Sequence, residues 1–232
     1  MWLLRSSGLM QAKLIIGSLL RLRSSVILRR RHRMFTKYEL YATTESIYCY
    51  RGTTVLRNRL DIRENGALKA AEEEITAVKQ YQLLLNPIAG RFSKTHLCRI
   101  HRFLFEDVYP FAGRLRREQI GKADTLFYPP AMIDRELNKI CTYIQKENCF
   151  STLDCDPLVD RLAFTMAELN IIHPFREGNG RAIREFIRTL ALHDGYLLNW
   201  GLTSRDELLE ASIQSVDDYR ALIPVLQKCI QS

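Results

Sequence analysis

The sequence predicts an all-α domain that carries one small β-hairpin. Apolar residues recur at helical spacing in one segment after another from residue 64 onward, and residues that start or end helices flank these segments. Residues 114–130 differ, because they alternate weakly around a Gly-Lys-Ala-Asp tip, which is typical of a β-hairpin. No internal repeat or low-complexity linker interrupts the pattern. We therefore expect residues 34–232 to form a single domain, preceded by a basic leader over residues 1–33.

Two helices are expected before the hairpin. The first ends near Asn86-Pro87, because proline cannot continue a helix. Ser93 is expected to cap the second helix with its hydroxyl oxygen. The residues expected to face the core are Leu68, Ala71, Ile75, Val78 and Leu85 in the first helix, and Leu97, Ile100 and Leu104 in the second.

Two more helices are expected between the hairpin and residue 170. Pro130 suits the first turn of one of them. The other is expected to start at Asp156-Pro157, where a capping side chain precedes proline at the first helical position. The predicted inward residues are Ile133, Leu137, Ile140 and Ile144 in the former, and Leu158, Leu162, Met166 and Leu169 in the latter.

The C-terminal quarter continues the helical pattern. A helix that begins near Gly180 should stop at Asp194-Gly195, a usual C-terminal signal. Ser204 and Glu207 have the spacing of a capping box for the next helix. The last apolar segment, YRALIPVLQKCI, predicts a helix with a kink at Pro224.

The positive charge of the chain is concentrated in the leader. Residues 1–33 hold eight of the 34 basic residues and no acidic one, so 26 basic residues face 26 acidic ones in the rest of the chain. We therefore expect no nucleic-acid partner for residues 34–232. The Arg- and Ser-rich leader is typical of an organellar transit peptide, and the alternative is an upstream extension before a start at Met34. Its apolar run is shorter than the ~20 residues of a membrane span, so no span is predicted.

The six cysteines predict neither disulfides nor a zinc site. They form no Cys-x-x-Cys pair, and without a convincing secretory signal they are expected to be reduced. His96, Cys98 and His101 are the nearest approach to a metal-binding group, but their spacing does not place all three on one helical face.

The stretch NIIHPFREGNGRAIREFI, residues 170–187, predicts a phosphate-binding loop. Asn179 lies between Gly178 and Gly180, so the backbone can turn several N–H groups toward one point and bind an anion where the next helix starts. Arg181 and Arg184 share one face of that helix and can reach a phosphate chain. Cations at a helix N-terminus oppose the helix dipole, which indicates an anionic ligand.

Two further residues of this stretch are a candidate metal ligand and a candidate base. Glu177 places a carboxylate beside the phosphate site, where Mg²⁺ suits a carboxylate combined with phosphate oxygens. His173 ends the preceding helix and can take a proton near neutral pH. Together with the loop, these residues predict a nucleotide-phosphate cradle with a metal ligand and a base.

The motif HPFREGNGRAIR resembles the signature of the Fic family, whose typical members are protein adenylyltransferases. Similar segments are YCYRGTTVLRNRLDI at 48–62, IHRFLFEDVYPFAGRLRREQIGK at 100–122 and LNW at 198–200, so the resemblance covers about residues 48–225. One departure is Arg51, where the family pattern has proline. The resemblance implies a Fic-type helical domain with a hairpin flap over the active site.

The resemblance also implies a role for each motif residue. His173 would deprotonate a hydroxyl group of a target protein, and Glu177 would hold Mg²⁺ between the α- and β-phosphates of ATP. Residues 178–180 would bind phosphate oxygens, with the asparagine stabilising charge on the α-phosphate. Arg181 and Arg184 would hold the phosphate chain while AMP is transferred and pyrophosphate leaves.

The flap from about Ile120 to Pro129 would hold the target by strand-like pairing. Ile120 and Lys122 are its expected contacts on the first strand, and Phe127 or Tyr128 is expected to clamp the target side chain. The alternative for these two aromatic residues is packing of the hairpin on the domain.

Inhibition is expected to come from a separate molecule. Many relatives carry an inhibitory helix with the pattern [S/T]-x-x-x-E-[G/N], and no glutamate of this chain fits it. We therefore expect a small antitoxin-like partner that pairs with Arg184.

Two alternatives to AMP transfer are left open. The chain could transfer UMP, phosphate or phosphocholine, or it could be a nucleotide-binding module without activity. Gly180 favours AMP, because relatives that phosphorylate tend to lose this glycine. A cytoplasmic, toxin-like enzyme is expected, with secretion into a host cell or an organellar site as the alternatives.

Overall fold

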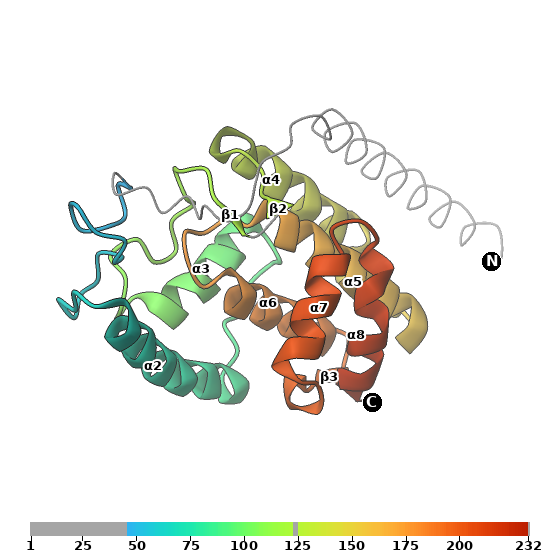
Figure 1. Cartoon of the computed structure of the whole chain (residues 1–232). Coiled ribbons are helices and arrows are strands. Elements are labelled where there is room, and N and C mark those ends of the chain that lie inside the picture. Colours follow the sequence, from blue (N-terminus) through green and yellow to red (C-terminus); the bar gives the residue numbers. More distant parts are fainter. Residues whose placement is uncertain (1–45, 123–124, 232) are drawn as a thin grey trace, which may run out of the picture. The chain divides into compact units, whose positions relative to one another are not determined.

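The computed structural model describes residues 46–122 and 125–231, and these are predominantly helical (Figure 1). The predicted leader and its boundary at residue 34 lie outside the described residues. The predictions of an all-α fold and of a small hairpin are confirmed. The α-helices are α2 (Asn65–Leu85), α3 (Lys94–Phe105), α4 (Pro130–Lys146), α5 (Cys155–Ile172), α6 (Asn179–His193), α7 (Arg205–Gln214) and α8 (Ile223–Cys229).

Helix α5 forms the centre of the core. Its residues from 162 to 169 are all buried, as expected for a helix that is apolar around most of its circumference. It packs against α4, α6 and α8, while α3 packs on α6 from the other side (Figure 1). The C-terminal end of α5 and the N-terminal end of α6 therefore meet inside a rigid helical frame. The predicted motif lies at this junction.

Most predicted helix boundaries and inward faces are confirmed. Ser93 accepts a hydrogen bond from the His96 N–H at the start of α3. Ser204 and Glu207 form the capping box of α7. The predicted inward residues of α3, α4 and α5 are all buried. Helix α6 ends at His193, and Gly195 follows with a left-handed φ of 85°.

Three predicted details of the helices were wrong. The residue that precedes α5 is Asp154, so Asp156 lies in its first turn instead of capping it. Pro224 does not kink a helix, because a 3₁₀-helix (Tyr219–Leu222) ends there and α8 begins with this proline in its first turn. Val78 and Leu85 of α2 are exposed, while Glu72 and Thr76 are buried.

Two short antiparallel strand pairs complete the described fold. In the flap, β1 (Gly121–Lys122) pairs with β2 (Thr125–Leu126), with Gly121 opposite Leu126. A second pair, β3 (Leu197–Leu198) with β4 (Ile230–Gln231), was not predicted. Two-residue strands leave no alternation for a sequence pattern to detect. Short 3₁₀-helices also occur over Asn148–Phe150 and Trp200–Leu202.

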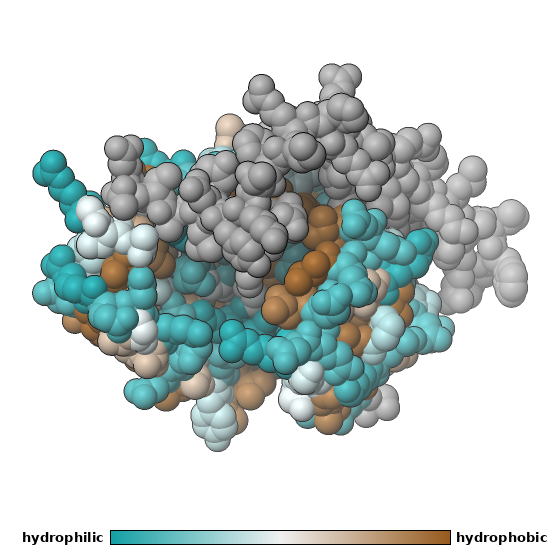
Figure 2. Space-filling model, viewed as in Figure 1, coloured by the Kyte–Doolittle hydropathy of each residue, from teal (hydrophilic) through white to brown (hydrophobic). Residues whose placement is uncertain are grey.

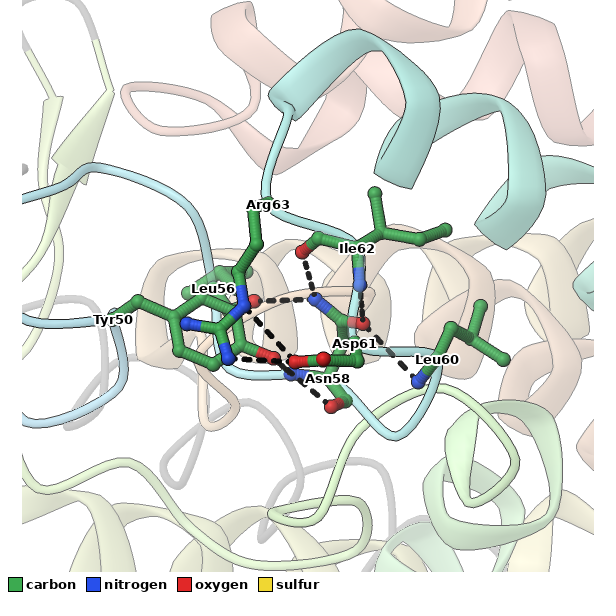
Figure 3. Close-up of polar contacts among 7 residues, drawn as sticks. All are labelled: Tyr50, Leu56, Asn58, Leu60, Asp61, Ile62 and Arg63. Atoms are coloured by element: carbon green, nitrogen blue, oxygen red, sulfur yellow. Dashed lines mark hydrogen bonds and ion pairs between the residues drawn. The ribbon is translucent and has the colours of Figure 1, made fainter.

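The segment before α2 is held by side-chain hydrogen bonds in place of regular structure (Figure 3). The Asn58 amide donates to the carbonyl oxygens of Leu56 and Ile62 at 2.9 and 2.8 Å. Its oxygen accepts from the N–H groups of Leu60 and Ile62. This loop fixes the chain ahead of Glu64, whose carboxylate caps the first turn of α2.

The visible surface of the described residues is mostly hydrophilic with hydrophobic residues between (Figure 2). Helix α2 exposes an apolar stripe near its C-terminal end that includes Val78, Tyr81 and Leu85. Across residues 46–122 and 125–231, no helix combines the length and the hydropathy that crossing a membrane requires.

Candidate active site

The connection between α5 and α6 places His173 at the end of a buried helix. His173 adopts a left-handed conformation, with φ 48° and ψ 64°, which terminates α5. Its N–H still donates to the carbonyl oxygen of Leu169 at 3.0 Å. Pro174 follows and cannot extend the helix. The histidine backbone is therefore fixed by the last helical hydrogen bond on one side and by proline on the other.

The imidazole ring of His173 has a defined tautomer and a defined plane. A carbonyl oxygen only accepts, so the contact of Nδ1 with the Asn170 carbonyl oxygen at 3.1 Å puts the proton of the neutral ring on Nδ1. The lone pair is then on Nε2. The Phe127 ring stacks on the imidazole, with 3.7 Å between ring centroids and 8° between planes. Nε2 is thus oriented to accept a proton from a ligand.

The loop before α6 is closed by the side chain of Asn179. Its oxygen accepts from the Phe175 N–H and its amide donates to the Phe175 carbonyl oxygen, both at 2.8 Å. Both residues are buried. Sequence reasoning predicted a phosphate contact for Asn179 and did not predict this clamp. The structure shows that the side chain first of all determines the shape of the loop.

The N-terminal end of α6 has no side-chain cap. Gly178 precedes the helix with φ 75° and ψ 11°, and no side chain caps the first turn. The N–H groups of Asn179, Gly180 and Arg181 belong to the first turn, where no helical carbonyl precedes them. Because the positive end of the helix dipole adds to these N–H groups, this end of α6 favours a phosphate group.

Glu177 lies beside this helix end. Its Oε1 accepts the Gly178 N–H at 3.0 Å. Across the part of the chain that the structure describes, no residue donates to its other carboxylate oxygen. A cation that completes its shell with phosphate oxygens needs only one such protein oxygen, so Glu177 fits Mg²⁺ bound together with a nucleotide. No group of three or more His, Cys, Asp or Glu in residues 46–122 and 125–231 could hold a metal by itself.

His101 holds the backbone of Glu177, a role that sequence reasoning missed. Its Nδ1 accepts from the Gly113 N–H at 2.9 Å, so Nε2 carries the proton and donates to the Glu177 carbonyl oxygen at 2.8 Å. The ring stacks on Phe175 with 3.8 Å between centroids. Burial lowers the pKa of His101 to about 4. Nothing in the spacing of His101 could have indicated a contact 76 residues along the chain.

The low pKa of His101 predicts a loss of stability in mild acid. The folded pKa of about 4 lies below the unfolded value of 6.5, so the neutral ring stabilises the fold above pH 6.5 and this contribution is lost as pH falls toward 4. The full effect is on the order of 3 kcal/mol. In His101→Gln, whose amide can accept from Gly113 and donate to Glu177, urea unfolding should show a shallower fall between pH 6.5 and 4.5. An equal pH dependence in both proteins would contradict the assignment.

Two residues of α2 hold the guanidinium of Arg181. Its guanidinium donates to the Thr76 hydroxyl at 2.9 Å and forms an ion pair with the buried Glu72 carboxylate. The Tyr109 hydroxyl donates to the other oxygen of Glu72. The Phe105 ring lies under the guanidinium, 4.7 Å from Cζ to the ring centroid. These contacts explain why Glu72 and Thr76 face inward on α2, where an apolar pattern could not find them.

Glu72→Gln is expected to lower the free energy of unfolding by about 1–3 kcal/mol, because it leaves Arg181 without its carboxylate and disturbs the hydrogen bond from Tyr109. Glu73→Gln is the matched control, since Glu73 is exposed on the same helix. Urea unfolding of the two variants measures the difference. Equal stabilities would mean that the Glu72 pair contributes nothing net.

Arg184 has no acidic partner among the residues that the structure describes. A methyl group built on Gly180 would lie 3.2 Å from its Nη1, so the guanidinium lies beside the N-terminal end of α6. Within the described ranges, no carboxylate lies within 4 Å of it. Burial, then the charges of Arg181 and Arg205, lower the pKa of Arg184 to about 10. A cation at this position is stabilised by an anionic ligand.

The flap packs against the end of α5. Ile120 and Phe127 are buried in a cluster with Ile171, and Tyr128 packs against that cluster. The Tyr128 N–H donates to the Ile171 carbonyl oxygen at 3.2 Å. Both aromatic residues thus make the packing contacts that were the alternative to a clamp, and their contact with a target stays a prediction. Lys122 lies in β1, but its side chain is outside what the structure describes.

Comparisons with known proteins agree with this geometry. The model of the Fic/DOC family matches residues 91–191. The chain is 37% identical to the probable protein adenylyltransferase Fic of Salmonella typhimurium and 35% identical to that of Escherichia coli, in each case over 79% of this chain and 91% of the relative. The crystal structure of an N-terminal Fic domain from Bartonella quintana with bound ADP superposes with a TM-score of 0.74, at 23% identity, over 79% of this chain and 94% of that one.

Proposed function

The chain belongs to the Fic/DOC family, and we propose that it transfers AMP from ATP to a hydroxyl group of a target protein at the site around His173. The chain is a protein adenylyltransferase, an activity that the relatives at 37% and 35% identity carry in their names. One observation supports the assignment of the site above all others. The Nε2 lone pair of His173 and the uncapped N-terminal end of α6 are held by the same short loop.

His173 is the general base of this reaction. The target hydroxyl gives its proton to Nε2, and its oxygen attacks the α-phosphorus in line with the bond to the β-phosphate. A new phosphorus–oxygen bond forms to the target, and pyrophosphate leaves with the electrons of the bond that breaks. Because Nδ1–H is held by the Asn170 carbonyl oxygen, the ring presents Nε2 without reorganisation.

The remaining residues of the loop bind the phosphates. The N–H groups of residues 179–181 and the α6 dipole stabilise charge on the transferred phosphoryl group. Arg181 is already paired with Glu72. Arg184 has no carboxylate partner among the described residues, so it is the stronger candidate to pair with the far end of the phosphate chain. Bound ADP in the structurally similar Fic domain from Bartonella quintana, and bound AMPPNP in the structurally similar BepC protein from Bartonella tribocorum, support a nucleotide as the ligand.

We assign the Mg²⁺ position to Glu177. When bound, the cation neutralises charge on the α- and β-phosphates. The contribution of the chain itself is to hold the carboxylate in place. It does so through the hydrogen bond from the Gly178 N–H on the side chain and that from His101 on the carbonyl oxygen of the same residue.

Target binding is assigned to the flap. The short β1–β2 hairpin lies next to His173 through the Phe127 contact, so a peptide that pairs with the flap would bring its hydroxyl toward Nε2. We also propose a cytoplasmic site of action, since ATP is abundant there and the cysteines among the described residues are free thiols.

Inhibition by a separate antitoxin-like protein is supported by Arg184. A glutamate supplied by a partner could pair with this cation and exclude the phosphates. The purified chain should therefore be active alone. If it is inactive and Glu72→Gln activates it, the inhibition lies within the chain instead.

The experiment that tests the function is intact-mass analysis of residues 34–232 incubated with Mg-ATP and a cell lysate, beside His173→Ala. A mass gain of one AMP on the enzyme or on a lysate protein, absent with the variant, is the expected result. Parallel reactions with UTP and CDP-choline follow the other transferable groups. If an adduct forms only with UTP or CDP-choline, the transferred group is UMP or phosphocholine and not AMP. If the intact enzyme forms no adduct with ATP, UTP or CDP-choline, the proposal is contradicted.

A further inference from the structure

Arg116 is a buried cation beside the site that the reaction as described does not use. Only 2% of its surface is exposed. No carboxylate lies within 4 Å of it among the residues that the structure describes. Burial lowers its pKa to about 10. Burying a guanidinium away from an anion costs free energy unless its donors are satisfied, so the role of Arg116 depends on the groups to which it donates.

The donors of Arg116 all go to backbone carbonyl oxygens. Nε donates to His173 at 2.7 Å, and Nη1 donates to Glu118 at 2.7 Å. Nη2 donates to Tyr128 at 2.5 Å, with a longer contact to Ile172 at 3.3 Å. Each segment contributes an oxygen that would otherwise need a donor. The planar guanidinium is suited to this arrangement, because its donors diverge from one rigid group.

The backbone of Arg116 makes a second link to the same place. Its N–H donates to the carbonyl oxygen of Pro174 at 2.8 Å. The residue thus binds both sides of the turn that terminates α5, and it binds the end of the flap at Tyr128. Its partners His173 and Tyr128 are 57 and 12 residues away from it along the chain.

We propose that Arg116 is a positioning residue that locks the end of the flap at Tyr128 to the turn carrying His173, so that the target hydroxyl and the base meet in one fixed geometry. The inference rests on the proposed function for its catalytic consequence, and on the hydrogen bonds alone for the lock. Arg116 acts through the backbone of its partners and contacts no reacting atom.

The stacking of Phe127 makes the lock relevant to the base. Phe127 precedes Tyr128 in the flap, and its ring lies on the imidazole of His173. A displacement of the Tyr128 carbonyl oxygen would shift Phe127 and tilt the ring that holds Nε2. The flap end and the base are therefore coupled at the backbone by Arg116 and at the side chains by the stack.

The lock predicts separate effects on transfer and on nucleotide binding. Arg116→Met fills the site with an apolar side chain of similar length and removes every guanidinium donor. AMP transfer should fall about 30- to 100-fold, since a misplaced base loses much of the benefit of orientation. The dissociation constant of Mg-ADP should change by less than about threefold, because the phosphate groups are bound by α6 and by Arg181 and Arg184.

A second readout does not depend on activity. Hydrogen–deuterium exchange of the peptide that contains Tyr128 should accelerate at least about tenfold in Arg116→Met, because local opening of the flap no longer breaks the hydrogen bonds of the guanidinium. Arg116→Lys keeps one cationic donor and should recover part of both the protection and the transfer. The control is Arg114→Met, an exposed arginine of the same segment, which should match wild type in each measurement.

The outcomes separate this inference from the proposed function. Faster flap exchange with slower transfer and unchanged Mg-ADP affinity supports it. Unchanged flap exchange in a folded Arg116→Lys or Arg116→Met protein overturns the lock. Equal losses of transfer and Mg-ADP affinity overturn the positioning role. If wild type itself transfers no AMP, the proposed function fails, while the exchange measurement still decides whether Arg116 locks the flap.

Discussion

Replacing His173 by alanine is expected to reduce AMP transfer at least about 1,000-fold while the dissociation constant of Mg-ADP stays within about threefold of wild type. In the proposed reaction this side chain supplies the lone pair that accepts the target proton, and its Nδ1–H already donates to the Asn170 carbonyl oxygen. Arg181 is held by Thr76 and Glu72, so its position does not depend on this ring. Transfer measured by mass spectrometry and Mg-ADP affinity by calorimetry test the two halves of the statement.

His193→Ala is the matched control for this variant, because His193 is an exposed histidine at the opposite end of α6. Its transfer rate should equal that of wild type. A His173→Ala protein that still transfers AMP at more than about a tenth of the wild-type rate would show that another group takes the proton. Loss of Mg-ADP binding in the same variant would instead mean that the imidazole supports the loop.

The sequence could predict the loop at the site because its chemistry is local. His173, Glu177 and the arginines that follow lie within one turn and the start of one helix, so their spacing alone brings them together. The helices could also be predicted from the sequence, because the inward residues of α3, α4 and α5 are apolar and face one core. In both cases the residues that act together are close in the sequence, so a local sequence pattern is enough to find them.

The residues that support the loop could not be predicted in this way. His101, Arg116 and Glu72 reach the site over 76, 57 and 109 residues of chain, and each presents a polar side chain to the interior. An apolar pattern treats such residues as surface positions. On α2 this made the predicted face partly wrong. Leu68 is buried as predicted, but the helix also buries Glu72 and Thr76 against Arg181 and leaves Val78 and Leu85 exposed.

Gly178→Ala is expected to damage both the fold and nucleotide binding. Alanine costs roughly 1–2 kcal/mol at a left-handed φ, and Gly178 has a φ of 75°. Its new methyl carbon would also lie 2.2 Å from the ring of the fully buried Phe105, far inside contact distance. Overpacking of this kind adds about 1–3 kcal/mol. The displaced loop would move the N–H groups of the first turn of α6, so Mg-ADP affinity should fall at least about tenfold.

Gly52→Ala separates the two causes. Gly52 has nearly the same φ, 74°, but a methyl group there would meet no atom within 4 Å. It should therefore show only the backbone cost of about 1–2 kcal/mol and bind Mg-ADP as wild type does. If urea unfolding gives Gly178→Ala the same loss as Gly52→Ala, the Phe105 ring yields to the methyl group and the clash does not matter. If Gly178→Ala is the less stable variant and binds Mg-ADP more weakly, the loop needs glycine because the Phe105 ring packs directly against position 178.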